Sequence, residues 1–337
     1  MEKKRINLAL QGGGAHGAFT WGLLDKFLEK DIFEIEGISA TSAGSMNAVV
    51  LAQGMLNGGK EGARELLHQF WHSMSEYGEC LMPKLPIDLI LEPILKMSLS
   101  FYMFSSMSNI FSPYQFNPSN FHPIQKVLEG IINFEQVKND SKIKLFICAT
   151  NVKTGKIRIF TRDEICMNAI LASACLPKLF QAVEVDNEYY WDGGYLGDPA
   201  IFPLIYNTDV RDIIILQTVP IVRETLPNTV MEIDTRLREI SFNSSLMREM
   251  RAISFVTKLI TEGWMKPEYA DKLKKMNLHS LRADHSMEEF SLASVYNADW
   301  GFLTKLRDLG REAAEAWLDK NYDSIGKEGT VDFNEWL

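Results

Sequence analysis

Several features that mark other protein classes are scarce in this 337-residue chain. The cysteines lack the short spacing of a metal or redox site, and most stand in apolar contexts, so we expect free thiols in a reducing compartment. No stretch is long and apolar enough to span a bilayer. The basic residues 1–5 lead into a strand and a glycine loop, which disfavours a secretory signal. We therefore expect a cytoplasmic protein and leave peripheral membrane contact open. The cysteines are Cys80, Cys148, Cys166 and Cys175.

Excess positive charge is also missing. The net charge is -9, and no Lys/Arg stripe offsets it, so a nucleic-acid surface is not expected. Bulk attraction to anionic lipid is excluded on the same ground. Repeats and low-complexity tracts are absent from the sequence. The composition, with 46% hydrophobic and 23% charged residues, is that of a soluble globular protein.

Two sharp turns near the start carry the strongest signal. Residues 6–11 read as a buried strand that runs into Gly12-x-Gly14-x-x-Gly17 and then a helix over residues 18–30. Residues 37–41 read as a second strand, which turns at Ser42 into a helix over residues 43–55. The first turn offers free backbone N–H groups at a helix start, and the second offers a hydroxyl. Together they predict half of an acyl-transfer site.

The glycine loop also matches the dinucleotide-binding fingerprint. That fingerprint requires an acid at the end of the next strand to hold the ribose. Here the strand ends in Ala40-Thr41-Ser42, although Glu34 and Glu36 precede it. The missing acid disfavours a nucleotide enzyme and favours an oxyanion role for the loop.

Ser42 needs a base, and two arrangements supply one. A triad in the order serine, acid, histidine would use Ser42, Asp192 and either His279 or His285. A serine with an acid alone would use Asp192, which stands between Trp191 and two glycines. Desolvation by the aromatic ring would raise the basicity of that carboxylate. The residues alone leave both arrangements open.

The remaining pattern alternates strands and helices. Residues 81–121 form an apolar segment interrupted by charges and Pro93, and helices packed on the domain, a dimer contact or a mobile lid that meets lipid would each explain it. Further helices are expected over residues 61–77, 124–132, 165–174, 231–263, 267–276 and 300–320. Strands over residues 142–150 and 156–161 are expected to form a hairpin, and residues 183–190 a second hairpin with its turn at Asp186-Asn187. Single strands are expected over residues 212–219 and 278–283.

Three short motifs in order resemble those of the patatin-like phospholipase family. They are the loop from Gly12 to Gly17, the elbow from Ala40 to Gly44, and Asp192-Gly193-Gly194. Each motif alone is weak, but the ordered set is specific, and the helical tail resembles that of bacterial members. Two residues depart from the family pattern. His16 stands where Arg or Lys is usual, which makes the charge there depend on pH. Ala40 replaces the first glycine of the elbow and adds a methyl group that must fit.

The resemblance implies a three-layer α/β/α fold with a mostly parallel central sheet and a C-terminal helical extension. It implies a serine carboxylic-ester hydrolase of the phospholipase A, lysophospholipase or esterase type, with a Ser42–Asp192 dyad and no metal or cofactor. Gly12, Gly13 and Gly14 would form the oxyanion hole. The expected supporting residues are His16, Gly17, Ala43, Gly44, Gly193 and Gly194.

The expected partners are a phospholipid or other acyl-ester lipid and, transiently, a membrane or micelle interface. A homodimer and a non-catalytic lipid-binding protein stay open as alternatives. We expect an acyl hydrolase domain over residues 1–217. Residues 218–337 would then be a mostly helical region packed on the same domain.

Overall fold

The chain folds around one eight-stranded sheet in the computed structural model, which describes residues 3–81, 106–264, 266, 269, 273–287, 290 and 292–336. The order is β5-β6-β3-β2-β1-β7-β8, with β4 paired to β3. The pairs among β3, β2, β1, β7 and β8 are parallel, and β4, β5 and β6 join in antiparallel pairs. The strands are β1 Lys4–Leu10, β2 Phe33–Thr41, β3 Lys144–Asn151, β4 Ile157–Phe160, β5 Val183–Val185, β6 Glu188–Asp192, β7 Asp212–Gln217 and β8 Asn277–Arg282.

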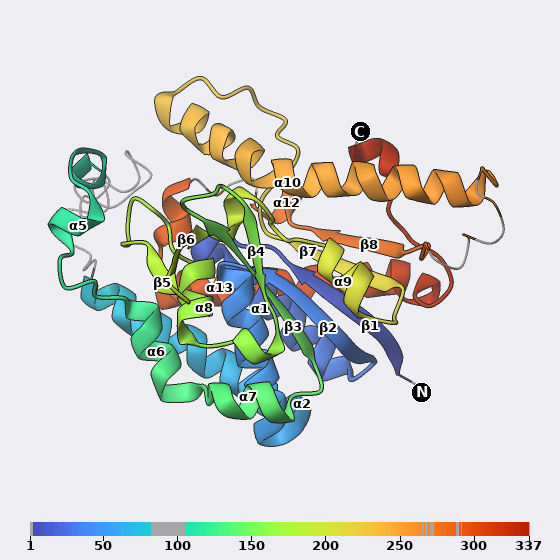
Figure 1. Cartoon of the computed structure of the whole chain (residues 1–337), viewed down its shortest axis with the longest axis horizontal. Helices are drawn as coiled ribbons and strands as arrows, with labels where there is room; N and C mark the ends of the chain where they lie inside the picture. The colour runs from blue at the N-terminus through green and yellow to red at the C-terminus, as the bar shows by residue number, and fades with distance from the viewer. Residues whose placement is uncertain are drawn as a thin grey trace.

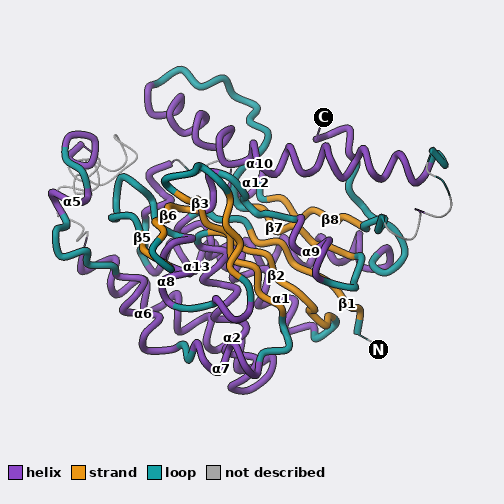
Figure 2. Tube along the Cα trace, in the orientation of Figure 1, coloured by secondary structure: helices purple, strands orange, loops and turns teal. Residues whose placement is uncertain are grey.

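Helices cover both faces of this sheet (Figure 1). On one face lie α1, α2 and α13, and on the other lie α9 and α10. The expected three-layer α/β/α fold with a mostly parallel sheet is thus confirmed, and Figure 2 shows the strands between the two helical layers. The main helices are α1 Gly17–Lys30, α2 Ala43–Leu81, α6 Pro123–Ile131, α7 Phe134–Asp140, α8 Met167–Ser173, α9 Phe202–Asn207, α10 Val230–Thr261 and α13 Trp300–Asn321.

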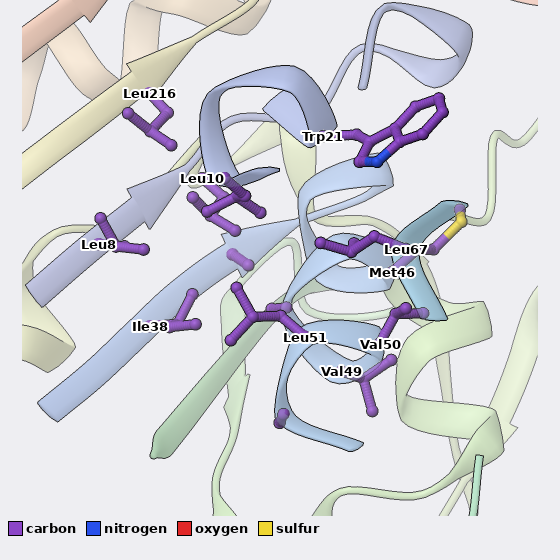
Figure 3. Packing of buried hydrophobic residues seen from close by; sticks show 14 of the residues in the cluster. Leu8, Leu10, Trp21, Ile38, Met46, Val49, Val50, Leu51, Leu67 and Leu216 are labelled. Atoms are coloured by element: carbon purple, nitrogen blue, oxygen red, sulfur yellow. The ribbon is translucent and has the colours of Figure 1, made fainter. Parts of the chain in front are cut away.

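Alternation along the buried strands explains the two layers. In β1, Leu8 and Leu10 face the larger apolar cluster with α1 and α2, whereas Ala9 between them faces α9 and α10. This is the period of two expected for a strand buried on both sides. Figure 3 shows the larger cluster, where Leu8 and Ile38 from the sheet lie beside Leu51 of α2.

The C-terminal region continues the same layers. Strand β8 adds to the sheet beside β7, with Ile214 opposite His279, and α13 packs along α1. The close approach of the two helices depends on glycine, because a Cβ on Gly22 would collide with the backbone of Arg307. Residues 218–337 therefore share the sheet and core of residues 1–217.

The two helices expected over 43–55 and 61–77 are confirmed, because the non-helical Gly58 and Gly59 interrupt α2 between them. The short helix α7 was not expected. The helix expected over 267–276 falls largely on residues outside the described part of the chain.

The apolar segment over residues 81–121 is described only in part. Residues 82–105 lie outside the described part of the chain, so its role stays a prediction. Its described end includes the short helix α5 Pro113–Phe116. Cys148, Cys166 and Cys175 are free thiols, as expected.

Candidate active site

Ser42 stands on a strained turn between β2 and α2. Its φ is 53°, a left-handed conformation that is unusual for a residue with a side chain. The backbone N–H of Ser42 donates to Oγ of Ser173 at 2.9 Å, and its carbonyl accepts the N–H of Ser45 at 2.9 Å. Ser42 as a whole residue is 9% exposed. This is the geometry of a nucleophile elbow, in which the turn pushes one hydroxyl toward a cavity.

The elbow requires small neighbours, as the sequence predicts. A Cβ on Gly44 would lie 2.5 Å from the carbonyl oxygen of Leu10, and one on Gly17 would lie 2.7 Å from Cβ of Ala43. Ala40 is fully buried in the main apolar cluster. The extra methyl group of Ala40 therefore packs in the core, and replacing the usual glycine with alanine leaves no apolar group exposed.

The glycine loop follows β1 and lies beside the elbow. Gly13 and Gly14 have φ values of 139° and 57°. The N–H of Gly12 donates to Oδ1 of Asp198 at 2.7 Å, so this N–H is occupied. Within the described part of the chain, the N–H groups of Gly13 and Gly14 have no acceptor. Two unoccupied backbone donors thus lie next to Ser42, on the wall of the cavity that it faces.

Strand pairing brings Asp192 to the elbow. Strand β2 pairs with β3 up to Thr41 opposite Cys148, and β6 pairs with the next stretch of β3 so that Asp192 is opposite Ala149. Strand β4 pairs with β3 across both stretches, so β2 and β6 must share the other edge of β3. The ends of β2 and β6 therefore meet head to head. Ser42 and Asp192 line the same cavity as a result.

The carboxyl group of Asp192 is fully buried. Burial raises its pKa to about 6, against the lowering effects of the Gly194 N–H, the Ser42 hydroxyl and the Arg238 charge. Its Oδ1 accepts the Gly194 N–H at 2.7 Å, whereas Oδ2 has no aligned hydrogen-bond partner among the described residues. The Ser42 hydroxyl is therefore a close neighbour without an aligned bond, and catalytic hydrogen bonds are often long before substrate binds.

His16 is a neutral residue in this site. Burial, followed by the charge of Arg223, lowers the pKa of His16 to about 4. The ring lies beside the contacting pair Phe290 and Phe302, and its Nε2 is 2.7 Å from Oγ of Ser294. From the sequence, the charge of His16 was expected to depend on pH. With this lowered pKa, His16 is uncharged at neutral pH. Positive charge comes instead from Arg223 and Arg238, which line the cavity beside Ser42.

Two cavities of different character meet at Ser42. One of about 400 Å³ is almost wholly apolar and extends between α2, α6 and the loop after α8. The other, of about 70 Å³, lies toward α10 and contains charged groups. Both are lined by Gly14, Ser42, Leu176 and Val295. The apolar cavity is also lined by Met46, Phe70, Trp71, Met74, Ile124 and Phe180.

Asp198 was not found from the sequence. It is fully buried, burial raises its pKa to about 8, and nearby Asp192 adds to the rise. Its Oδ2 has no partner among the described residues. Arg238 also escaped sequence analysis, because it stands in no motif. Asp198 does follow the Asp192-Gly193-Gly194 motif closely, and an acid before a proline in that loop was the available signal.

His279, one of the two histidines expected for a triad, does not join Ser42. His279 is buried in β8, where its Nε2 lies 3.1 Å from Asp212 and its Nδ1 lies 3.1 Å from Thr330. It does not line either cavity beside Ser42. His285 belongs to α12 Asp284–Met287, and its side chain lies outside the described part of the structure.

Glu36, an acid in β2 that a nucleotide site could have used, is occupied elsewhere. It accepts the N–H groups of Asp209 and Val210 at 3.0 Å each, and pairs with Lys144. Among the described residues, no group of three His, Cys, Asp or Glu side chains could hold a metal ion. None of the described helices has the length and apolarity needed to cross a membrane.

Comparison with solved structures finds distant similarity. VipD from Legionella pneumophila is 15% identical with a TM-score of 0.43, over 95% of this chain and 67% of that one. The type III effector ExoU is 14% identical with a TM-score of 0.35, over 95% of this chain and 54% of that one. Full-length ExoU from Pseudomonas aeruginosa, in complex with SpcU, is 15% identical with a TM-score of 0.30, over 99% of this chain and 76% of that one. This chain thus spans about half to three quarters of the length of these proteins. Comparison with curated proteins finds no match.

Comparison with protein families gives a clear result. The sequence model described as patatin-like phospholipase matches residues 8–205, which is more than half of the chain. The matched region includes the glycine loop, Ser42 and Asp192. The chain therefore belongs to the patatin-like phospholipase family.

Proposed function

We propose that this chain is a lipid acyl hydrolase that cleaves fatty-acyl esters through a covalent acyl-enzyme on Ser42. The family relation supports a lipid hydrolase in general. The observation that carries the specific proposal is the position of Ser42. Its hydroxyl stands between a carboxylate whose burial raises its pKa and two unoccupied N–H groups, at the junction with a large apolar cavity.

The proposed first step forms the acyl-enzyme. Oγ of Ser42 attacks the carbonyl carbon of the ester while its proton passes to Oδ2 of Asp192. Oδ1 already accepts the Gly194 N–H, so Oδ2 is the oxygen able to take the proton. The N–H groups of Gly13 and Gly14 stabilise the oxyanion, and such donors contribute most where water is excluded. The alcohol leaves with the proton returned by Asp192.

The second step releases the fatty acid. A water molecule gives its proton to Asp192 and attacks the acyl carbon, and Ser42 regains its proton from Asp192 as the acyl–oxygen bond breaks. A carboxylate can serve as this base near neutral pH when its pKa approaches the working pH, which burial achieves for Asp192. The apolar cavity supplies a place for the acyl chain, and the lipid comes from a micelle or membrane surface.

Residues 1–217 and 218–337 both contribute to the proposed site. The first part supplies the nucleophile, the base and the oxyanion donors. The second part supplies Arg223, Arg238 and Phe242 on the wall of the charged cavity. We propose that the two parts act as one unit, and that residues 1–217 alone would leave the site open on this side.

A lipid-class screen tests the function. Purified chain is offered phospholipids, lysophospholipids, acylglycerols and soluble esters, and Ser42→Ala is assayed beside it. We expect fatty-acid release by the wild-type chain on at least one class, and a loss of that release of at least about 10³-fold in the variant. Lipid binding without fatty-acid release, equal in both proteins, would identify a non-catalytic lipid-binding protein instead.

A further inference from the structure

The charged cavity beside Ser42 has one wall made by α10. Four residues of that helix face it, at the three- and four-residue spacing of one helical side: Thr235, Arg238, Glu239 and Phe242. The opposite side of the helix exposes Ile233, Leu237 and Ile240 to solvent. The helix α10 thus directs charged side chains toward the candidate site. Because burying a charged group is unfavourable unless the group is paired, the partners of these side chains matter.

The three arginines near this cavity differ in how they are paired. Arg223 and Arg236 both bind the carboxylate of Glu239, at 2.6 Å and 3.1 Å. Arg238 lies within salt-bridge distance of no carboxylate among the described residues. Its Nη1 donates to the hydroxyl of Tyr296 at 2.8 Å. A guanidinium has five N–H donors, so most of those of Arg238 remain available toward the cavity.

The charges of the cavity wall balance while Asp192 is ionised, because two arginines, Arg223 and Arg238, offset two carboxylates. Glu239 is neutralised by Arg223 and Arg236, and His16 is neutral at pH 7 because burial lowers its pKa. Asp192 and Arg238 remain, and Asp192 loses its negative charge whenever it accepts the Ser42 proton. A second anion near Arg238 would then restore the balance. Guanidinium groups bind phosphate oxygens in a forked geometry better than most other anions.

We propose that Arg238 binds the phosphate of the substrate's head group, so that the ester spans the two cavities at Ser42. The acyl chain then lies in the apolar cavity of about 400 Å³ and the phosphate in the charged cavity of about 70 Å³. The small cavity has room for only several water-sized groups, which suits a phosphate and excludes a second acyl chain. This inference rests on the proposed function and assigns Arg238 as the residue that sets a preference for acyl esters that carry a phosphate.

Two matched lipids test the proposal. They are 1-acylglycerol 3-phosphate and 1-acylglycerol with the same acyl chain, assayed below their micellar concentrations. For Arg238→Gln we expect kcat/KM to fall roughly 10- to 100-fold more for the phosphate lipid than for the neutral one, the size of a charge-assisted contact. Any effect of Arg238 on Asp192 changes both rates together and cancels in their ratio. Arg238→Lys should recover part of the preference.

The exposed Arg248 on the same helix gives the control. Arg248→Gln removes the same charge and should leave the ratio unchanged. An equal loss on both lipids with Arg238→Gln would show that Arg238 acts through Asp192, and no loss on either would remove it from the site. Both outcomes overturn the proposal.

A binding arm separates this proposal from the hydrolase proposal. In Ser42→Ala, which cannot turn over, the Kd of the phosphate lipid should rise about 10-fold or more on adding Arg238→Gln, while the Kd of the neutral lipid changes less. That result supports the phosphate subsite even when no hydrolysis is detected in the wild-type chain. Inorganic phosphate is tested in the same assay. Arg238-dependent binding of inorganic phosphate without any lipid preference would indicate a free anion and contradict the head-group assignment.

Discussion

Thr41 and Asp192 end two strands that meet head to head on one edge of β3, opposite the consecutive residues Cys148 and Ala149. This relationship fixes, by main-chain pairing, how far the proposed nucleophile lies from the proposed base. Rigid elements hold catalytic groups better than loops do. The proposed dyad thus depends on the register of β6 against β3, and so on the hydrogen bond from Oγ1 of Thr150 to the Asp192 carbonyl at 2.8 Å.

The pH dependence of hydrolysis should report Asp192. Its carboxylate must be ionised to take the Ser42 proton, and burial raises its pKa to about 6. We expect kcat/KM to be constant above this pH and to fall about tenfold per unit well below it. Asp192→Asn should reduce kcat about 10²- to 10⁴-fold. Asp186→Asn, in the exposed turn before β6, is the control and should change neither rate nor profile.

Replacement of Asp198 should change how stability depends on pH. Burial raises the pKa of Asp198 to about 8 in the folded chain, well above that of an unfolded aspartate. The protonated form therefore favours folding. Its contribution is complete below about pH 4 and is lost as the pH rises to about 8. Asp198→Asn mimics the protonated acid at every pH.

We therefore expect Asp198→Asn to be more stable than the wild-type chain at pH 8, by on the order of 1–3 kcal/mol. The difference should shrink toward zero near pH 4. Urea unfolding at several pH values measures it. A difference that stays constant with pH would mean that Asp198 does not titrate in this range.

Alanine at Gly14 should damage catalysis more than folding. A Cβ there would lie 2.5 Å from the carbonyl oxygen of Val295 and would move an oxyanion donor. Loss of one such donor lowers kcat about 10²- to 10³-fold. Gly155 is the matched control, since it has a similar positive φ of 63° but open space around it. If Gly14→Ala and Gly155→Ala have equal activity, the loop does not hold the oxyanion.

A larger side chain in the apolar cavity should shorten the accepted acyl chain. Met74 lines that cavity, whereas Met55 on the same helix is 39% exposed and does not. Met74→Trp should displace about two methylene groups of a long acyl chain, which at about 0.8 kcal/mol each lowers kcat/KM roughly tenfold. Short-chain esters should be affected less. Equal losses on long and short chains, or the same change in Met55→Trp, would argue that the acyl chain lies elsewhere.

The parts of the site that could be predicted from sequence are those whose signal lies in a few consecutive residues. Ser42 and the glycine loop each follow a buried strand, and Asp192 ends a hairpin, so local pattern made all three candidates. The ordered resemblance to the family was needed to choose a dyad over a triad. Asp198 was missed because its contact with Gly12 joins residues 186 positions apart. Arg238 is one charge among several on a long helix, and only the packing of α10 shows which of them faces Ser42.

The protonation state of His16 also depends on residues that are distant in the sequence. The sequence showed a histidine where a cation is usual, but the ring is enclosed by Phe290 and Phe302 from the far end of the chain. Its neutrality is a consequence of that tertiary burial. The fold was predicted more completely, because alternating strands and amphipathic helices record burial locally. The break in α2 was predicted as well, since Gly58 and Gly59 separate the two helical patterns.

Covalent labelling of Ser42 tests the account most directly. The folded chain is treated with a fluorophosphonate at pH 8, and the modified residue is identified by peptide mass spectrometry. We predict one adduct, on Ser42, that forms far more slowly in Asp192→Asn and not at all in Ser42→Ala. An unmodified Ser42 in the folded wild-type chain, or an adduct on another serine that carries the activity, would contradict the proposed dyad.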